Sequence, residues 1–352
     1  MLLQSRLLND TVQLAPDNQI LFLNSAADPF VTVAAGRIAL DPHATGAIML
    51  AEDNLASLQM AMGEAERANL HANNLRHVAF HEYSLHEPPA TMDVAVMNLL
   101  YQPGNSWVLY GLQVAAYALK HGGRLYVVGA KDRGVLSTAK RMQEIFGNVE
   151  TLAISKGHRV VSSHVGAACN AQFIAPKTSP NELLSLVFAD GKLDEGTHLL
   201  LDALEIRPAD QALDIGCGAG FIGLHIARLA SQGHVTMVDV SLLTVAVAQR
   251  RVAESGLTNI KVLPSDGAQA VLQQRFDLVV TNPPFHQGGI QTTEIAARFI
   301  REAAQVLQPH GRFYLVANRF LKYEPTLRAH FKTLEEVGGN TRFKVLRAIH
   351  PH

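Results

Sequence analysis

Three glycines at alternate positions, Gly216, Gly218 and Gly220, follow a short apolar run in the segment LDIGCGAG. Glycine suits a tight turn between a strand and a helix, where a ligand approaches the backbone and the helix amides face it. Asp214, two residues before the first glycine, is placed to pair with a positive charge. A G-x-G-x-G loop preceded by an acid suits a nucleoside with a cationic amino-acid tail, which points to S-adenosylmethionine.

A nicotinamide or flavin dinucleotide is the rival ligand for such a loop. Its fingerprint has a third glycine three residues after the second, and this chain has Phe221 there. Asp239, nineteen residues after Gly220 and at the end of the next predicted strand, is placed to hydrogen-bond ribose hydroxyls. Asp266 and Gly267 end the third predicted strand and could contact adenine, although Asp-Gly is as typical of an ordinary turn.

The segment DLVVTNPPFHQGG ends an apolar strand with Asn282, Pro283, Pro284 and Phe285. This strand end resembles the motif of methyltransferases that modify amino groups conjugated to a planar system: adenine N6, guanine N2 or a glutamine amide. On this interpretation the Asn282 side-chain oxygen and the Pro283 carbonyl each accept an N–H bond, which aims the nitrogen lone pair at the methyl group. The prolines fix the loop, Phe285 stacks on the target ring, and His286 is a further candidate for a base contact.

The elements that position these residues alternate from residue 194 onward. Apolar runs predict strands at 211–216, 234–240, 260–266, 276–282 and 311–318. Amphipathic runs predict helices at 195–206, 220–231, 242–256 and 294–307. Strands that alternate with helices predict an α/β fold, with a parallel, doubly wound sheet that binds ligands at the carboxyl ends of its strands.

The first half of the chain repeats this order in weakened form. MDVAVMNLLYQPG matches FDLVVTNPPFHQG, with Asn98 at the position of Asn282, and two further segments match in the same order. The repeat predicts two tandem domains, 1–178 and 179–352, joined by the Pro-, Ser-, Thr- and Asn-containing segment 175–182. The first copy lacks glycines after its first strand and has NLLY in place of NPPF, so we interpret it as degenerate.

Composition limits the possible functions. The chain has 352 residues, 48% of them hydrophobic and 17% charged, which is typical of a folded protein with two cores. The formal net charge of −1 does not indicate a nucleic-acid binder, so any RNA affinity must come from a local patch. Cys169 and Cys217 are far apart in sequence and predict neither a disulfide nor a metal pair. No signal segment or membrane-length apolar run is present, and the cytoplasm is therefore expected.

Two groups of residues have ordinary explanations beside functional ones. Four histidines between residues 71 and 86 match no metal-ligand spacing, so we predict no metal site. Cations outnumber anions from His310 to His352, and Arg319, Arg342 and Lys344 are candidates for RNA phosphate contacts. The alternation in TRFKVLRAI also predicts an edge strand with a charged outer face, and for any single cation this explanation is favoured.

Five segments together carry a specific family resemblance: FADGKLDEGTHLLLDAL, LDIGCGAG, NPPFHQGGIQTT, VANRFLKY and TRFKVLRAI. They resemble the tandem-domain ribosomal RNA guanine-N2 methyltransferases of bacteria, the RsmC and RlmG type, and the small-subunit enzymes most. The resemblance implies two tandem Rossmann-like class I methyltransferase domains. The carboxyl-terminal one would be active, and its amino-terminal relative would have lost cofactor binding and assist folding or RNA recognition.

The resemblance also implies the reaction and its residues. S-adenosylmethionine would be the donor and the N2 amine of a guanine in 16S ribosomal RNA the acceptor, in a protein expected to act as a monomer on RNA or a ribosomal subunit. The segment 282–285 would form the acceptor site, and Asp214, Gly216, Asp239 and Asp266 would hold the cofactor. A paired guanine would have to be extruded from its helix to reach such a pocket.

Two alternatives remain open at this point. The NPPF motif does not separate guanine N2 from adenine N6 or from a glutamine amide. A non-catalytic RNA-binding assembly factor would keep the fold alone, but it has no physical need of an intact glycine loop, an acid and NPPF together.

Overall fold

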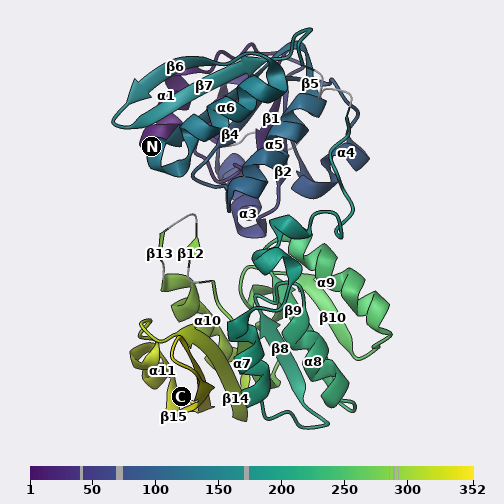
Figure 1. Ribbon diagram of the computed structural model, residues 1–352, viewed down its shortest axis with the longest axis vertical. Coiled ribbons are helices and arrows are strands. Elements are labelled where there is room, and N and C mark those ends of the chain that lie inside the picture. The colour runs from purple at the N-terminus through teal and green to yellow at the C-terminus, as the bar shows by residue number, and fades with distance from the viewer. Residues whose placement is uncertain (40–42, 69–73, 170–173, 285, 288–289, 292) are drawn as a thin grey trace. The chain divides into compact units, whose positions relative to one another are not determined.

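The computed structural model describes residues 1–39, 43–68, 74–169, 174–284, 286–287, 290–291 and 293–352. It divides into two compact units, Met1–Leu186 and Val187–His352, and each has its own seven-stranded sheet (Figure 1). The predicted linker, 175–182, lies just before this division.

The sheet of the first unit has the strand order β3-β2-β1-β4-β5-β7-β6. Its strands are β1 (Gln19–Leu23), β2 (Ala47–Glu52), β3 (Leu75–Ala79), β4 (Met92–Asn98), β5 (Leu119–Ala130), β6 (Glu150–Ser155) and β7 (His158–His164). The α-helices of its described part are α1 (Leu3–Thr11), α2 (Phe30–Ala39), α3 (Leu55–Arg67), α4 (Tyr83–His86), α5 (Asn105–Ala118) and α6 (Val135–Phe146).

The sheet of the second unit has the order β10-β9-β8-β11-β14-β16-β15, which matches the first unit strand for strand. Its strands are β8 (Gln211–Ile215), β9 (His234–Asp239), β10 (Ile260–Pro264), β11 (Phe276–Thr281), β14 (Leu307–Asn318), β15 (Phe331–Gly339) and β16 (Phe343–Pro351), and a separate short pair is formed by β12 (His286–Gln287) and β13 (Ile290–Gln291). The α-helices of its described part are α7 (Glu195–Ala203), α8 (Phe221–Leu229), α9 (Leu242–Ser255), α10 (Glu294–Val306) and α11 (Glu324–His330).

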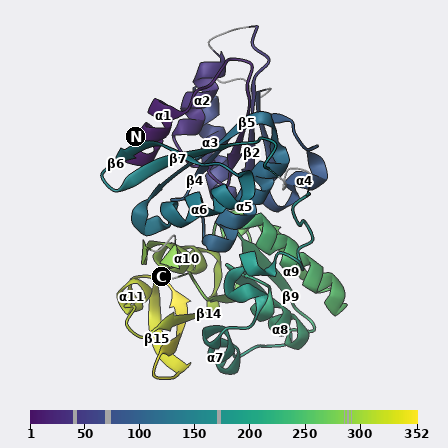
Figure 2. The same ribbon diagram turned by 45° about the horizontal axis from the view of Figure 1, so that its top comes forward.

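Helices cover both faces of the second sheet (Figures 1 and 2). Leu213 and Ile215 of β8 pack in a hydrophobic cluster with α10 and α11, whereas Ala212 packs with α7, α8 and α9. Side chains alternate along a strand, so Asp214 lies on the α8 face, where it bonds the helix backbone. In the first unit α1, α2 and α3 pack on one face, and α5 and α6 also contact the strands.

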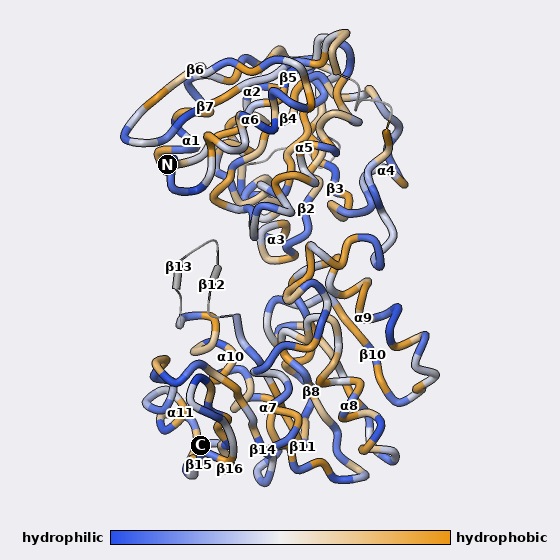
Figure 3. The backbone as a smooth tube through the Cα atoms, in the orientation of Figure 1, coloured by the Kyte–Doolittle hydropathy of each residue, from blue (hydrophilic) through white to orange (hydrophobic). Residues whose placement is uncertain are grey.

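The central strands are rich in hydrophobic residues because they are covered on both sides (Figure 3). Pairing in the two sheets is parallel except for four antiparallel pairs: β5 with β7 and β7 with β6 in the first unit, and β14 with β16 and β16 with β15 in the second. The predicted α/β class is confirmed, and the shared strand order shows that both units have the same fold.

One strand lies elsewhere than predicted. The segment TRFKVLRAI forms most of β16, which pairs with β14 on one side and with β15 on the other. Its prediction as an edge strand is wrong, because alternation reveals a strand but long-range pairing decides where that strand inserts. The edges of this sheet are β10 and β15.

Candidate active site

The glycine loop joins β8 to α8 in a conformation that requires its glycines. The φ angles of Gly216, Gly218 and Gly220 are 71°, 55° and 84°, in the left-handed region that side chains with a Cβ adopt at a cost of about 1–2 kcal/mol each. A Cβ added to Gly218 would meet no atom within 4 Å. The loop therefore exposes backbone to open space, where a ligand can approach it closely.

Asp239 fixes this loop from the end of the next strand. One carboxylate oxygen accepts a hydrogen bond from the Gly218 N–H at 3.0 Å, and the other accepts one from the Ser241 N–H at 3.0 Å. Burial raises the pKa of Asp239 above its usual range. The acid predicted to bind ribose thus also holds the glycine loop in place, a role that its position in the sequence did not reveal.

Asp214 lies behind the loop and is fully buried. Its Oδ2 accepts a hydrogen bond from the Gly223 N–H at 3.0 Å, and its Oδ1 has no partner among the residues that the structure describes. Burial raises its pKa to about 7. A buried acid with one unpaired oxygen fits a nearby cation, although Asp214 does not itself line the pocket described below.

Asn282 directly follows β11, next to the glycine loop. The hydroxyl of Thr281 donates to the Ile215 carbonyl at 2.8 Å, which ties the ends of β11 and β8 together. The Asn282 Nδ2 donates to Asp194 Oδ2 at 3.2 Å and to Thr197 Oγ1 at 3.0 Å. Asp194 and Thr197 belong to the start of α7 and were not among the predicted site residues.

The remaining acceptor-site candidates lie along the same loop. Pro283 is buried and Pro284 is exposed. Phe285 lies outside the described residues, so its predicted stacking stays a prediction. His286 begins β12, and the structure describes its backbone position only.

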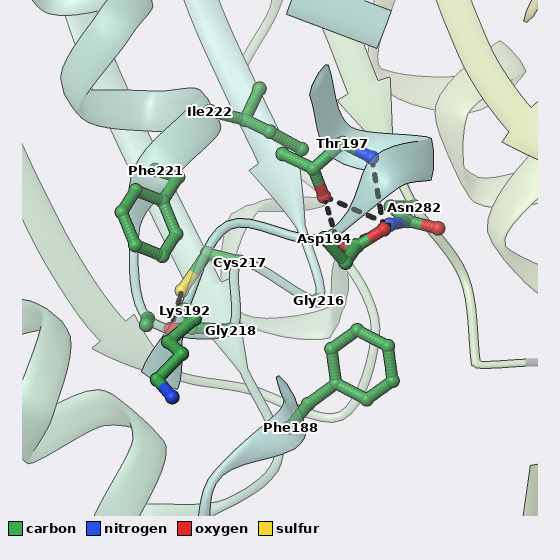
Figure 4. A pocket seen from close by; sticks show the side chains of 11 residues that line it. Phe188, Lys192, Asp194, Thr197, Gly216, Cys217, Gly218, Phe221, Ile222 and Asn282 are labelled. Carbon is green, nitrogen blue, oxygen red and sulfur yellow. Dashed lines mark hydrogen bonds between the residues drawn. The ribbon is translucent and has the colours of Figure 1, made fainter. Parts of the chain in front are cut away.

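One pocket of the second unit brings the two motifs together (Figure 4). Asn282 and Asp194 line it together with Gly216 and Gly218. Phe188, which is 62% exposed, also lines the pocket. The predicted cofactor loop and the predicted acceptor residue therefore face the same space.

A short strained turn, Phe188–Gly191, carries that exposed ring. Ala189 and Asp190 have φ angles of 53° and 52°, which are unfavourable for residues other than glycine. Arg251 connects this turn to the glycine loop, since its guanidinium donates to the Gly191 carbonyl at 2.7 Å and to the Ala219 carbonyl at 3.3 Å. Neither contact follows from a local pattern in the sequence.

Asp266 and Gly267 follow β10 and are held by α10. The Arg298 guanidinium donates to both Asp266 oxygens, at 2.6 and 2.5 Å. Gly267 has a φ of 60°, and an added Cβ would lie 2.2 Å from a carboxylate oxygen of Glu302, which itself accepts the Ala268 N–H. Side chains of α10 thus hold the turn after β10. The Asp266 side chain is still 24% exposed and can make a further contact.

The three cations predicted to contact RNA all have acidic partners. Arg319 pairs with Glu336 at 2.7 Å, and Arg342 pairs with Glu195 at 2.7 Å. Lys344 pairs with Glu324 at 2.5 Å, and its side chain is 6% exposed. The two arginines lie at the surface, whereas the lysine lies inside the fold.

The first unit fills the equivalent site with its own side chains. The strand pairings align Asn98 with Asn282, and Asn98 is fully buried. Its Nδ2 donates to Asp28 at 2.6 Å, and its Oδ1 accepts the Leu100 N–H at 2.9 Å. The Gln102 amide donates to the carbonyls of residues 23 and 24, so the strand ends are bridged internally.

The described part of the chain contains no group of three or more His, Cys, Asp or Glu side chains that could hold a metal ion. No helix in that part is long and apolar enough to cross a membrane.

Comparisons with known proteins define the class first. Residues 183–347 match the model of the methyltransferase small domain, which covers nearly all of the second unit. The second unit is thus a methyltransferase domain.

Individual relatives then define the family. The ribosomal RNA small subunit methyltransferase C of Hahella chejuensis is 36% identical over 68% of this chain and 72% of its own length, and that of Shewanella loihica is 32% identical over 74% and 78%. The solved structure of the Thermus thermophilus 16S rRNA N2 G1207 methyltransferase, in complex with AdoMet and guanosine, matches 99% of this chain and 91% of its own, with a TM-score of 0.78 and 27% identity. The chain belongs to the ribosomal RNA small subunit methyltransferase C family, which confirms the resemblance found in the sequence.

Proposed function

We propose that this chain transfers a methyl group from S-adenosylmethionine to the exocyclic N2 amine of a guanine in 16S ribosomal RNA, at the position equivalent to G1207. The observation that carries the proposal is the pocket shared by Asn282 and the glycine loop. The Thermus relative supports the donor, the base and the RNA, since that protein is a 16S N2 methyltransferase solved with AdoMet and guanosine.

The proposed cofactor site consists of the glycine loop and the acids around it. Gly218 offers open backbone, Asp239 is the proposed ribose contact, and Asp214 supplies a buried oxygen for a cation, unpaired among the described residues. Asp266, at the end of β10, is the proposed adenine contact. When bound, S-adenosylmethionine supplies an electrophilic methyl group on a positively charged sulfur.

The proposed acceptor site acts on the amine of the base. The lone pair of that nitrogen is delocalised into the ring, so the amine is a poor nucleophile until its hydrogens are held. Asn282 Oδ1 and the Pro283 carbonyl accept one N–H bond each, and both favour the positive charge that grows on nitrogen. Phe285 stacks on the ring, and the proton leaves after the transfer, so no general base is needed.

The proposed RNA contacts lie at the surface of the second unit. Arg319 and Arg342 are 42% and 70% exposed, and exposed ion pairs of this kind contribute little to stability. They can therefore exchange their carboxylate partners for phosphates. We leave Lys344 out of this contact because its ammonium is buried and paired.

The proposal extends to the first unit and to the cellular setting. The first unit assists RNA recognition or folding, because its own site is closed by internal hydrogen bonds. The protein acts as a monomer in the cytoplasm, where its ribosomal substrate is found.

The test combines the purified protein with methyl-labelled S-adenosylmethionine and three unmodified substrates: small-subunit particles, large-subunit particles and naked 16S RNA. The RNA is then digested and the labelled nucleoside identified. Label in N2-methylguanosine at the G1207-equivalent position supports the proposal, with the Asn282→Ala variant as the inactive control. Label in N6-methyladenosine would contradict guanine as the acceptor and indicate adenine instead. Cofactor binding without methyl transfer to any of the substrates would favour a non-catalytic assembly factor.

A further inference from the structure

The side-chain amide of Asn282 has only one orientation that its neighbours accept (Figure 4). Its Nδ2 lies 3.2 Å from Asp194 Oδ2 and 3.0 Å from Thr197 Oγ1. A carboxylate oxygen only accepts hydrogen bonds. The Thr197 hydroxyl hydrogen is already donated to Asp194 Oδ2 at 2.6 Å, so its oxygen accepts from Asn282 as well. Both neighbours require the nitrogen on their side, which turns Oδ1 away from them.

Pro284 itself offers that oxygen no N–H donor. In the first unit the Leu100 N–H, two residues after Asn98, donates to Asn98 Oδ1 and closes a local turn. The residue two positions after Asn282 is Pro284, which has no N–H. Within the described residues no hydrogen bond reaches Asn282 Oδ1, and this oxygen is not among the buried unpaired atoms. No donor that the structure describes therefore competes with a substrate for this oxygen.

We infer that Asp194, Thr197 and Pro284 are positioning residues that present Asn282 Oδ1 as an unoccupied acceptor for the substrate amine. The inference rests on the proposed function and adds residues outside the glycine loop to its machinery. The Asp194 carboxylate also polarises the amide through its N–H bonds, which increases the negative charge on Oδ1 where positive charge develops on the substrate.

A purely structural role is the competing explanation. Asp194 caps the start of α7, since its Oδ1 accepts the Thr197 N–H at 3.0 Å. Asparagine caps helices as well as aspartate does, so Asp194→Asn keeps the cap. The new side chain has only one oxygen. If that oxygen accepts the Thr197 N–H and keeps the cap, an NH₂ group faces the Asn282 NH₂ group. The substitution therefore separates capping from orientation.

The experiment measures kcat and KM for RNA, affinity for S-adenosylhomocysteine, and the urea midpoint of each variant. Asp194→Asn should lower kcat roughly 10- to 100-fold, below the loss from removing a preorganised acceptor outright. The affinity of Asp194→Asn for S-adenosylhomocysteine should stay within about twofold of wild type, and its urea midpoint within a few tenths of a molar. Thr197→Ser, which keeps the hydroxyl, should match the wild type, whereas Thr197→Val should lose about tenfold in kcat. Pro284→Ala, which restores an N–H, should lower kcat in the same direction.

A double-mutant cycle shows whether Asp194 acts through Asn282. In the Asn282→Ala background, Asp194→Asn should cause no further loss of kcat, because the oxygen that it positions is absent. Multiplying losses would overturn the inference, as would an Asp194→Asn enzyme within about twofold of wild-type kcat. If Asp194→Asn does not fold, the variants Thr197→Ser and Thr197→Val provide the test. Equal kcat values for these two variants would overturn the inference.

Failure of the proposed function gives a different result. In that case the wild type transfers no methyl to guanine, whatever the variants do. The orientation is then read without activity from the Asn282 side-chain NH₂ resonances, assigned by their loss in Asn282→Ala. A shift of these resonances in Asp194→Asn and Thr197→Val, but not in Thr197→Ser, supports the inference, and unchanged resonances in all three would overturn it.

Discussion

Replacement by alanine should affect the two equivalent asparagines, Asn98 and Asn282, differently: one substitution should lower stability and the other methyl transfer. Asn98 is fully buried, and its side-chain amide is bonded through both its nitrogen and its oxygen. Asn282 is half-buried at the pocket, and no described residue donates a hydrogen bond to its side-chain oxygen. We expect Asn98→Ala to lower stability and leave transfer unchanged. Asn282→Ala should abolish most transfer with little loss of stability and nearly intact cofactor affinity.

The magnitudes follow from the partners that each substitution leaves behind. Asn98→Ala removes a buried hydrogen bond to the Asp28 carboxylate, about 1.5–3 kcal/mol, and leaves the Leu100 N–H unpaired, about 1 kcal/mol more. The free energy of unfolding of the first unit should fall by about 2–4 kcal/mol, and its melting temperature by on the order of 10 °C. Asn282→Ala removes the proposed acceptor of the substrate amine, so kcat should fall about 10²- to 10³-fold.

The assay must separate folded fraction from rate per folded molecule. Urea unfolding gives the stability of each variant, and transfer to 16S RNA is then measured well below the unfolding midpoint, normalised to folded protein. Equal damage to kcat by Asn98→Ala and Asn282→Ala would refute the division into one active and one closed site. An Asn98→Ala variant as stable as the wild type would refute the buried network as the reason for closure.

Three further predictions concern charged groups of the second unit. Asp239→Ala should weaken S-adenosylhomocysteine binding about 10- to 100-fold by calorimetry, because the hydrogen bond to Gly218 and the proposed ribose contact are lost together. Asp239→Asn should weaken this binding less. The pKa of Asp214 in the folded protein is about 7, above the usual 3.8, so its contribution to stability is full below about pH 4 and is lost as pH rises through about 7. Asp214→Asn should therefore reduce the change of the urea midpoint with pH over this range. Arg312→Ala should lower the free energy of unfolding by about 3–5 kcal/mol in urea titration, because Asp210, 2% exposed, loses its partner at 2.5 Å.

The sequence predicted what depends on local pattern. The periodicity of hydrophobic residues predicted the order of helices and strands. The glycine loop was predictable because its left-handed φ angles favour glycine, which leaves a G-x-G-x-G pattern in the sequence. The end of α9 is a similar case, since Gly256 caps it with a φ of 69°. Such signals lie within a few residues of the structure that they specify.

What the sequence missed depends on partners far along the chain. Cations outnumber the acids of the same stretch near the carboxyl terminus, but Arg312, Arg342 and Arg347 pair with acids 102, 147 and 142 residues earlier. Asp194 was likewise visible as a residue before a helix, yet its contact with Asn282 spans 88 residues. Only the sheet topology, which brings the start of α7 to the end of β11, creates that contact.

The two copies show what separates an active site from a closed one within the same fold. Both keep a strand-end asparagine and an acid at the end of the second strand, since Glu52 accepts the Ala26 and Asn54 N–H groups much as Asp239 accepts those of the loop and of Ser241. A buried polar atom without a partner costs about 1–3 kcal/mol, so a copy freed from function gains stability when each such atom finds an internal partner. In the first unit a leucine N–H and an aspartate supply those partners. In the second, Asp194 and Thr197 accept from the Asn282 nitrogen, but Pro284 has no N–H to donate, and among the described residues no donor occupies the Asn282 oxygen.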